Sequence, residues 1–201
     1  MKTKKIKILP VLIIAVLGFM AFKPLDKKVV LIDAGHGGYD VGKDLYGFEE
    51  KAITEAIARK IKEQNNNENV EIVLIRDGDM SMNLTDRVTI INKLKPDLVL
   101  SIHINANSNM KANGVGAYIS SNKTFYDESK KMAEIAVDKI TSTGKLSKRQ
   151  INEAPFHILK YANCSMVHLE IGFLSNENDR NYITSEDGQN EIASKILESL
   201  N

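Results

Sequence analysis

The sequence predicts a single α/β domain with a mostly parallel, twisted sheet of about five to six strands and helices on both faces. Short aliphatic runs, typical of buried strands, alternate along the chain with longer segments whose apolar residues recur at helical spacing. The 201 residues are 43% hydrophobic and 26% charged, which is enough apolar material for one domain with a substantial core.

Three strands and two helices are expected in the first half of this domain. An aliphatic run between charged residues and a glycine-rich loop predicts the first strand. Apolar residues at helical spacing from Ala52 to Ile61 predict the first helix, and Asn83 or Thr85 can cap the second, which Pro96 ends. The expected elements are strands at 28–33, 70–75 and 97–104, and helices at 49–64 and 85–94.

The second half continues the alternation. The segment GVGAYIS at 114–120 is expected to form a fourth strand, and an amphipathic segment that stops before Gly144 predicts a third helix. A polar loop is expected at 144–156, before a final apolar strand and a C-terminal helix. The expected elements are strands at 114–120 and 166–171, and helices at 125–141 and 186–200.

Residues 1–24 differ from the rest of the chain in composition. Lys2 to Lys7 form a cationic start, and Ile8 to Phe22 form an apolar run that is short for a membrane span and typical of an export signal. We expect residues 1–24 to be a signal peptide or an uncleaved signal anchor, and residues 25–201 to form the folded domain. Contact with a membrane is therefore expected only through the N-terminal segment.

The charge of the domain argues against nucleic acid as a partner. The N-terminal segment holds five lysines and no acid, so the remainder has 22 basic and 26 acidic residues and a net charge of −4. A mildly acidic domain lacks the basic face that binds a phosphate backbone. We expect no nucleic-acid partner.

Ionisable residues lie at the ends of the expected strands. His36 follows the first strand between glycines, His103 lies near the end of the third, and Glu170 lies near the end of the last. Ligands of such sheets bind beyond the carboxyl ends of the strands. Glu50, at the start of the first helix, adds a carboxylate. Two histidines and one carboxylate from separate elements can form an open zinc site with water in the fourth position.

Amide hydrolysis is the chemistry that this residue set suits. Zinc polarises a carbonyl group and makes hydroxide available near neutral pH, and a carboxylate can carry a proton to the leaving nitrogen. Glu170 lies within an otherwise apolar strand, where an unpaired charge is costly, so a function there would explain it.

Each of these residues also has a structural interpretation. A histidine in a glycine-rich turn is commonly a loop feature, and Glu50 suits a helix start because the helix dipole favours an acid there. His103 could be a hydrogen-bonded core residue, and Glu170 could be half of a buried ion pair. The residues alone leave both interpretations open.

Other features are assigned structural roles. Cys164, the single cysteine, is expected to be an inert buried thiol. His157 and His168 are interpreted as structural, and a role of His168 in supporting Glu170 is kept as an alternative because both lie on the same strand face. The glycine-rich turn is no dinucleotide fingerprint, because Asp40 stands where the third glycine would be.

Four ordered motifs give the sequence a family resemblance. They are LIDAGHGGYDVG at 31–42, EEKAIT at 49–54, LSIHINA at 100–106 and LEIGFLSN at 169–176. Together they resemble the zinc-dependent N-acetylmuramoyl-L-alanine amidases of the type-3 amidase family, across 28–200. The resemblance implies one zinc ion held by His36, Glu50 and His103, with Glu170 as the catalytic residue.

The resemblance also implies a substrate and a location. Such an enzyme is a peptidoglycan hydrolase that uses zinc-activated water to cleave the amide between the lactyl group of N-acetylmuramic acid and L-alanine of the stem peptide. Its partner would be the glycan strand with its stem peptide. The protein would be exported and would act in the periplasm, the cell envelope or the forespore intermembrane space.

Smaller family features fall in register, and a few positions depart from the pattern. Arg76-Asp77, Arg87 and Asn92 match. Ala34 stands where proline is usual, Ile75 where threonine is common, and His168 where an aliphatic residue is expected. None of these departures falls on a residue implied to bind zinc.

Two alternative functions are kept: a zinc peptidase or carboxypeptidase acting on the stem peptide, and a non-catalytic wall-binding module. The need for a protein activator is left open. Only 66 residues separate His103 from Glu170, and 105–113 lacks apolar periodicity. We therefore expect an open site that no helix inserted in this segment covers.

Overall fold

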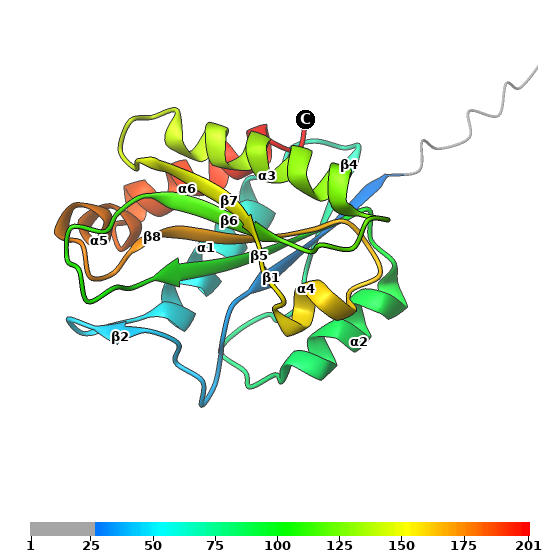
Figure 1. Cartoon of the computed structure of the whole chain (residues 1–201), viewed down its shortest axis with the longest axis horizontal. Coiled ribbons are helices and arrows are strands. Elements are labelled where there is room, and N and C mark those ends of the chain that lie inside the picture. The colour runs from blue at the N-terminus through cyan, green and yellow to red at the C-terminus, as the bar shows by residue number, and fades with distance from the viewer. Residues whose placement is uncertain (1–26) are drawn as a thin grey trace, which may run out of the picture.

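The computed structural model describes residues 27–201 (Figure 1), and in them six strands form one sheet. The strands, in chain order, are β1 (Lys28–Ala34), β4 (Val70–Leu74), β5 (Leu98–Asn105), β6 (Val115–Ile119), β7 (Lys148–Glu153) and β8 (Met166–Phe173).

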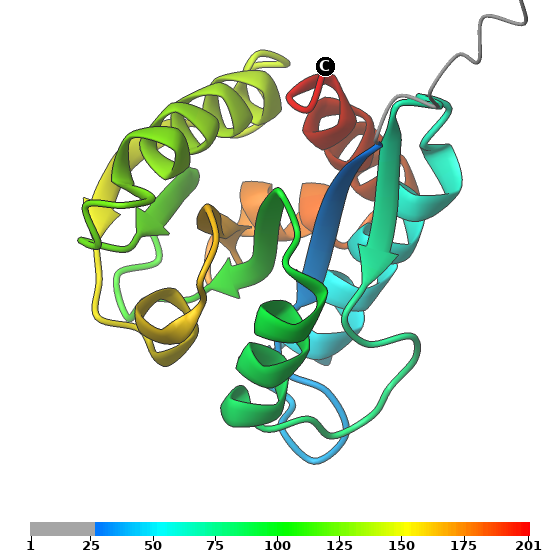
Figure 2. The same cartoon turned by 90° about the vertical axis from the view of Figure 1, so that its right-hand side faces the viewer.

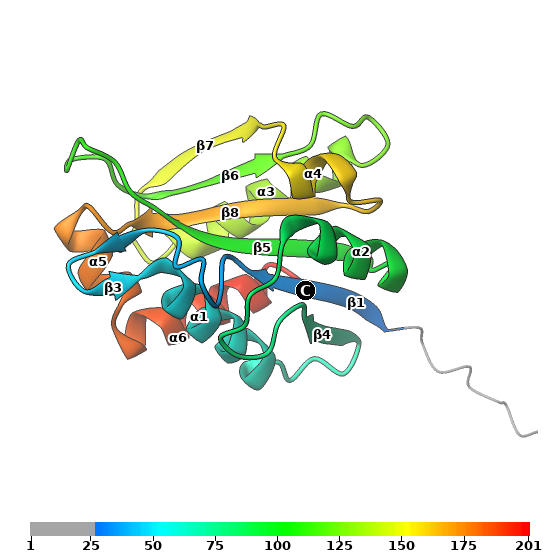
Figure 3. The same cartoon turned by 90° about the horizontal axis from the view of Figure 1, so that it is seen from below.

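Across the sheet the strand order is β4-β1-β5-β8-β6-β7 (Figure 3). β4, β1, β5 and β8 are mutually parallel, β6 runs antiparallel to β8, and β7 is parallel to β6. The prediction of a mostly parallel sheet of about five to six strands is confirmed.

Helices cover both faces of this sheet, as predicted (Figure 2). The helices are α1 (Glu50–Gln64), α2 (Leu84–Leu94), α3 (Tyr126–Thr141), α4 (His157–Tyr161), α5 (Glu177–Ile183) and α6 (Glu186–Glu198). Buried residues of α1, α3 and α6 share one hydrophobic cluster, whereas those of α2 and α4 belong to a second, smaller cluster. No helix among residues 27–201 is long and apolar enough to cross a membrane.

The alternation of side chains along the central strands decides where a site can form. Residues such as Val30 and Ile32 pack into the larger cluster, while Leu31, Val99 and others at the strand starts pack under α2 and α4. Farther along the strands, the positions on this second face are polar. They are Asp33, Ser101, His103, His168 and Glu170.

Some elements were not predicted. The segment at 144–156, expected to be a polar loop, contains β7, and the short helices α4 and α5 were also missed. A two-stranded hairpin of β2 (Asp44–Leu45) and β3 (Phe48–Glu49) precedes α1. β7 is an edge strand whose residues are mostly exposed, so it lacks the apolar alternation that reveals a strand. The expected signal segment, residues 1–24, lies outside the described residues.

A buried ion pair lies under the loop that follows β1. Arg87 donates to Asp33 Oδ1 (2.5 Å) and to the carbonyl oxygens of Ala34 and His36, and Ser101 Oγ donates to Asp33 Oδ2 (2.7 Å). Burial works to raise the pKa of Asp33, but the contacts with Arg87 and Ser101 outweigh it and hold that pKa below its usual range. Asp33 is therefore ionised near neutral pH.

A second buried arginine binds the same loop. Arg76 donates to the carbonyl oxygens of Ala34 (3.1 Å), Gly35 (3.2 Å) and Lys51 (3.0 Å), and it pairs with Glu55 (2.9 Å). The turn after β1 is thus tied to both α1 and α2 by guanidinium groups, whose fixed planar geometry suits several carbonyl acceptors at once.

Replacing Arg87 by methionine should lower the free energy of unfolding of the metal-free protein by about 3–5 kcal/mol, because it leaves Asp33 buried without its partner. The loss should be largest where Asp33 is ionised in both proteins, and should shrink as the pH falls through the pKa of the partnerless Asp33, which burial raises in the variant, and then through its lowered pKa in wild type. Urea unfolding across this pH range measures it. Arg59→Met, which removes an exposed arginine paired with Glu55, should cost less than about 1 kcal/mol; equal losses would contradict this assignment.

Candidate metal centre and active site

His36 projects from the turn that follows β1. Its backbone adopts a left-handed conformation (φ 59°), which a non-glycine residue adopts only at a cost. Asp40 Oδ2 lies 2.8 Å from His36 Nδ1, so the other ring nitrogen is turned toward Glu50. Gly42 passes so close that a Cβ there would stand 2.6 Å from both the His36 ring and the Glu50 carboxylate. The turn can hold this histidine only because that position has no side chain.

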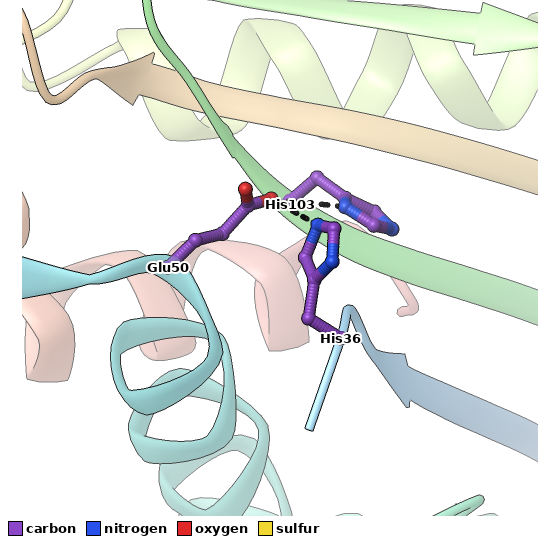
Figure 4. A group of neighbouring side chains, drawn as sticks. All are labelled: His36, Glu50 and His103. Atoms are coloured by element: carbon purple, nitrogen blue, oxygen red, sulfur yellow. Dashed lines mark hydrogen bonds and ion pairs between the residues drawn. The ribbon is translucent and has the colours of Figure 1, made fainter. Parts of the chain in front are cut away.

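Glu50 is the first residue of α1, where the helix dipole favours a carboxylate. Its side chain is almost fully buried, and Oε1 lies 3.1 Å from His36 Nε2 and 3.0 Å from His103 Nδ1 (Figure 4). The same oxygen accepts a hydrogen bond from the backbone N–H of Ile104 (3.0 Å), and Oε2 accepts one from that of Lys43 (2.9 Å). Both oxygens are therefore fixed.

His103 completes the cluster from β5. Its ring lies edge-on to that of His36, with centroids 5.0 Å apart. The backbone of Gly35 runs directly against the His103 ring, since a Cβ at this glycine would stand 2.4 Å from Cε1. Two imidazole nitrogens and one carboxylate oxygen thus converge from three separate elements, with ligand atoms within 4.8 Å of one another. This donor set can hold a metal ion, as the sequence indicated.

The charges of the cluster suit a cation. Burial works to raise the pKa of Glu50, but the contacts with His103 and His36 outweigh it and hold that pKa well below its usual range. Burial tends to lower the pKa of His36, while Glu50 and Asp40 raise it above its ordinary value. A metal would therefore meet an ionised carboxylate and would displace a proton from His36 in mildly acidic solution.

Glu170 lies beside this cluster on the neighbouring strand, directly opposite His103 in the β5–β8 register. Its Oε1 lies 3.2 Å from His168 Nε2, while its Oε2 is buried without a hydrogen-bond partner among the described residues. The His168 ring stacks on that of His103 at 4.2 Å. Burial lowers the pKa of His168, so this imidazole is neutral near pH 7.

Two of these neighbours were not assigned to the site from the sequence. Asp40 was used only to exclude a dinucleotide loop, and His168 was interpreted as structural. The spacing of His168 two residues before Glu170 was the available signal, because alternate residues of a strand face the same side. His157 lies outside the cluster and packs on Tyr161 (4.7 Å).

The cluster and Glu170 open into one cavity of about 800 Å³. The start of α2 and the start of α4 form its far wall, where Phe156 and Leu84 are partly exposed. The side chains of His36, His103 and Glu170 are each about one-fifth exposed. No helix lies between Asn105 and Val115, and α3 packs on the opposite face of the sheet, so the structure agrees with the expectation of an uncovered site.

The remaining sequence features have structural positions. Cys164 is buried away from the cluster, and burial raises the pKa of its thiol to about 11, as expected for an inert cysteine. Asn92 accepts a hydrogen bond from the backbone of Asn163 (2.8 Å) and donates to the carbonyl of Tyr161 (2.9 Å), which ties α2 to the end of α4.

Known proteins are similar to this chain in both sequence and fold. The family model described as N-acetylmuramoyl-L-alanine amidase matches residues 30–201. The N-acetylmuramoyl-L-alanine amidase AmiA of Escherichia coli is 27% identical, over 87% of this chain and 75% of AmiA.

Solved structures agree with this match. An N-acetylmuramoyl-L-alanine amidase from Clostridium difficile 630 superposes with a TM-score of 0.82, at 29% identity over 87% of this chain and 95% of the other. The CwlD amidase of Clostridioides difficile, solved in complex with the GerS lipoprotein, superposes with a TM-score of 0.80, at 27% identity over 87% and 96%. The chain belongs to the N-acetylmuramoyl-L-alanine amidase family, and the predicted family resemblance is confirmed.

Replacing Gly35 by alanine should lower the affinity for a divalent transition metal by at least about tenfold, because the new Cβ must displace the His103 ring. A competition titration with a chromogenic chelator measures the affinity. Gly47→Ala is the matched control: nothing lies within 4 Å of a Cβ there, so only the strain of its positive φ should be felt. Wild-type affinity in Gly35→Ala, with a folded protein, would contradict the proposed packing of His103.

Proposed function

We propose that this chain is a zinc-dependent amidase that hydrolyses the bond between the lactyl group of N-acetylmuramic acid and the first L-alanine of the stem peptide. The observation that carries the proposal is one cavity in which His36, Glu50 and His103 converge next to the carboxylate of Glu170. Membership of the amidase family supports both the reaction and peptidoglycan as substrate.

The donor set fits zinc. Two imidazoles and one carboxylate form a three-ligand site that keeps a coordination position for water or substrate. When bound, zinc would polarise the amide carbonyl and make hydroxide available near neutral pH. Asp40 accepts the Nδ1 proton of His36 and so directs Nε2 toward the metal position, as carboxylates behind metal-binding histidines commonly do.

Glu170 is proposed to move the proton. Its carboxylate lines the cavity and can take a proton from the attacking water and pass it to the amide nitrogen, so that the peptide leaves as a neutral amine. His168 would hold the other oxygen, because its neutral ring can donate Nε2–H to Oε1. This hydrogen bond would orient the carboxylate while Glu170 lines the cavity.

The two alternative functions are less well supported. A zinc peptidase acting within the stem peptide would need the same ligands, but the family match and the similar solved structures are to N-acetylmuramoyl-L-alanine amidases. A wall-binding module without activity would not need an ionised Glu50 beside two histidines and a free carboxylate oxygen on Glu170.

Residues 1–24 are proposed to export the domain, as a signal peptide or an uncleaved anchor, because a lysine-rich start precedes an apolar run. Residues 25–201 would then act on peptidoglycan in the periplasm, cell envelope or forespore intermembrane space.

An exposed site predicts basal activity of the isolated domain on a soluble muropeptide. Because CwlD was solved in complex with the GerS lipoprotein, the same turnover assay should also be run on this chain with candidate partner proteins added.

The metal assignment predicts that wild-type protein binds one zinc ion per chain and loses turnover when zinc is chelated. His36→Ala and His103→Ala should weaken zinc binding by more than the roughly 10–100-fold that loss of an outer-shell partner costs, since each removes a ligand. Metal analysis after dialysis measures this. His157→Ala, which removes a histidine that is in the cavity but outside the cluster, should retain full zinc; full zinc in all three variants would refute the site.

Glu170→Gln should lower kcat by about 10²–10⁴ while zinc stays bound, because the amide cannot carry the proton. Turnover of a soluble muropeptide and zinc content are measured on the same sample. Glu177→Gln, which neutralises an exposed acid at the start of α5, is the control and should leave both unchanged. Near-normal turnover by Glu170→Gln would mean that another group moves the proton.

His168→Leu should lower kcat about tenfold or more with little change in KM, because the hydrogen bond to Glu170 is lost while the substrate contacts remain. His168→Gln retains an N–H donor at a similar reach and should restore much of the rate. If leucine and glutamine have equal effects, His168 acts only through packing.

A further inference from the structure

A second cavity also has Glu170 in its lining. It has a volume of about 320 Å³ and extends along β6 and β7 at the edge of the sheet. Glu170 lines both this cavity and the larger one, whereas none of the three proposed zinc ligands lines it. The two cavities therefore meet at the carboxylate proposed to move the proton. We call the smaller one the edge cavity.

A bulge in β7 shapes the edge cavity. Val115 pairs with Lys148 and Ala117 with Ile151, so β7 has one more residue than β6 across this interval. Such a bulge re-aims side chains and is frequent next to active sites. The residue of β6 opposite the bulge is Gly116, where a Cβ would already stand 3.1 Å from the Gln150 carbonyl. The bulge gives Arg149 and Gln150 to the cavity wall.

Arg149 is held in place although it is exposed. Its guanidinium lies over the ring of Phe173, 5.0 Å from the centroid, and Nη1 donates to the Asn113 carbonyl (3.1 Å). No carboxylate of residues 27–201 forms an ion pair with it, while the neighbouring Lys148 pairs with Asp138. The remaining N–H groups of Arg149 are therefore oriented and available to an anion.

The two cavities differ in charge. Two cations, Lys148 and Arg149, line the edge cavity, and Glu170 is its only acid. The larger cavity has more acids than cations: its acids are Asp33, Asp40, Glu50, Asp86 and Glu170, and its cations are Lys43 and Arg87. A negatively charged part of a substrate is therefore favoured in the edge cavity, and a neutral part is tolerated in the larger one.

We propose that the edge cavity is the subsite for the stem peptide, and that Arg149 binds a carboxylate of the peptide on the leaving side of the scissile amide. The proposal rests on the proposed function, because it places the leaving nitrogen next to Glu170. N-acetylated glycan is uncharged apart from its peptide branches, whereas the residue after L-alanine in the stem is an acidic D-glutamate. A guanidinium matches a carboxylate in bidentate geometry.

The test compares two substrates: N-acetylmuramoyl-L-alanyl-D-glutamate, with both carboxylates free, and the same molecule with both converted to carboxamides. Zinc-loaded wild-type protein should hydrolyse both, with kcat/KM about tenfold higher for the acid, mainly through KM. Arg149→Gln should abolish this preference, and its rate on the diamide should stay within about twofold of wild type. Lys145→Gln removes an exposed cation three residues before the bulge start at Lys148 and should keep the preference.

Direct binding separates this inference from the proposed function. Free L-alanyl-D-glutamate, titrated by NMR, should bind wild type about tenfold more tightly than it binds Arg149→Gln. Equal affinities, or an unchanged preference in Arg149→Gln, would overturn the edge-cavity assignment even if the amidase reaction stands. Binding that depends on Arg149 without turnover of either substrate would support the subsite and overturn the proposed function.

Discussion

The site depends on one buried carboxylate, Glu50. Ionised and almost inaccessible to water, it would be very costly without compensation. His36 from the turn after β1, His103 and the Ile104 N–H from β5, and the Lys43 N–H provide that compensation. Because α1 begins at Glu50, its dipole adds to this compensation. The same contacts that make the carboxylate tolerable in the fold place it beside two histidines, where it could bind a metal ion.

The rest of the fold holds that arrangement in place. Arg87 and Arg76 both bind backbone carbonyls at the end of β1, so the turn with His36 is tied to α1 and α2. Helices α2 and α4 cover only the starts of the strands on their face of the sheet. The polar residues farther along, including His103 and Glu170, are therefore left beside a cavity instead of under a helix.

Much of this could be predicted from the sequence, for physical reasons. Buried parallel strands are continuous aliphatic runs, so a histidine or glutamate within one, such as His103 or Glu170, is conspicuous. Strand β7 could not be predicted, since an exposed edge strand has no apolar pattern. Because β7 forms a wall of the edge cavity, that cavity and Arg149 could not be predicted either. His168 was undervalued because a neutral buried imidazole is revealed only when its neighbours across the sheet are known.

The central claim is that Glu50, with its two histidines, is the centre of a zinc site, and anomalous X-ray diffraction tests it most directly. Crystals of the zinc-loaded protein would be measured on both sides of the zinc absorption edge. We expect one anomalous peak per chain, about 2.0–2.2 Å from His36 Nε2, from an imidazole nitrogen of His103 and from a carboxylate oxygen of Glu50. A zinc peak bound elsewhere, with Glu50 still paired only to the two histidines, would contradict the account.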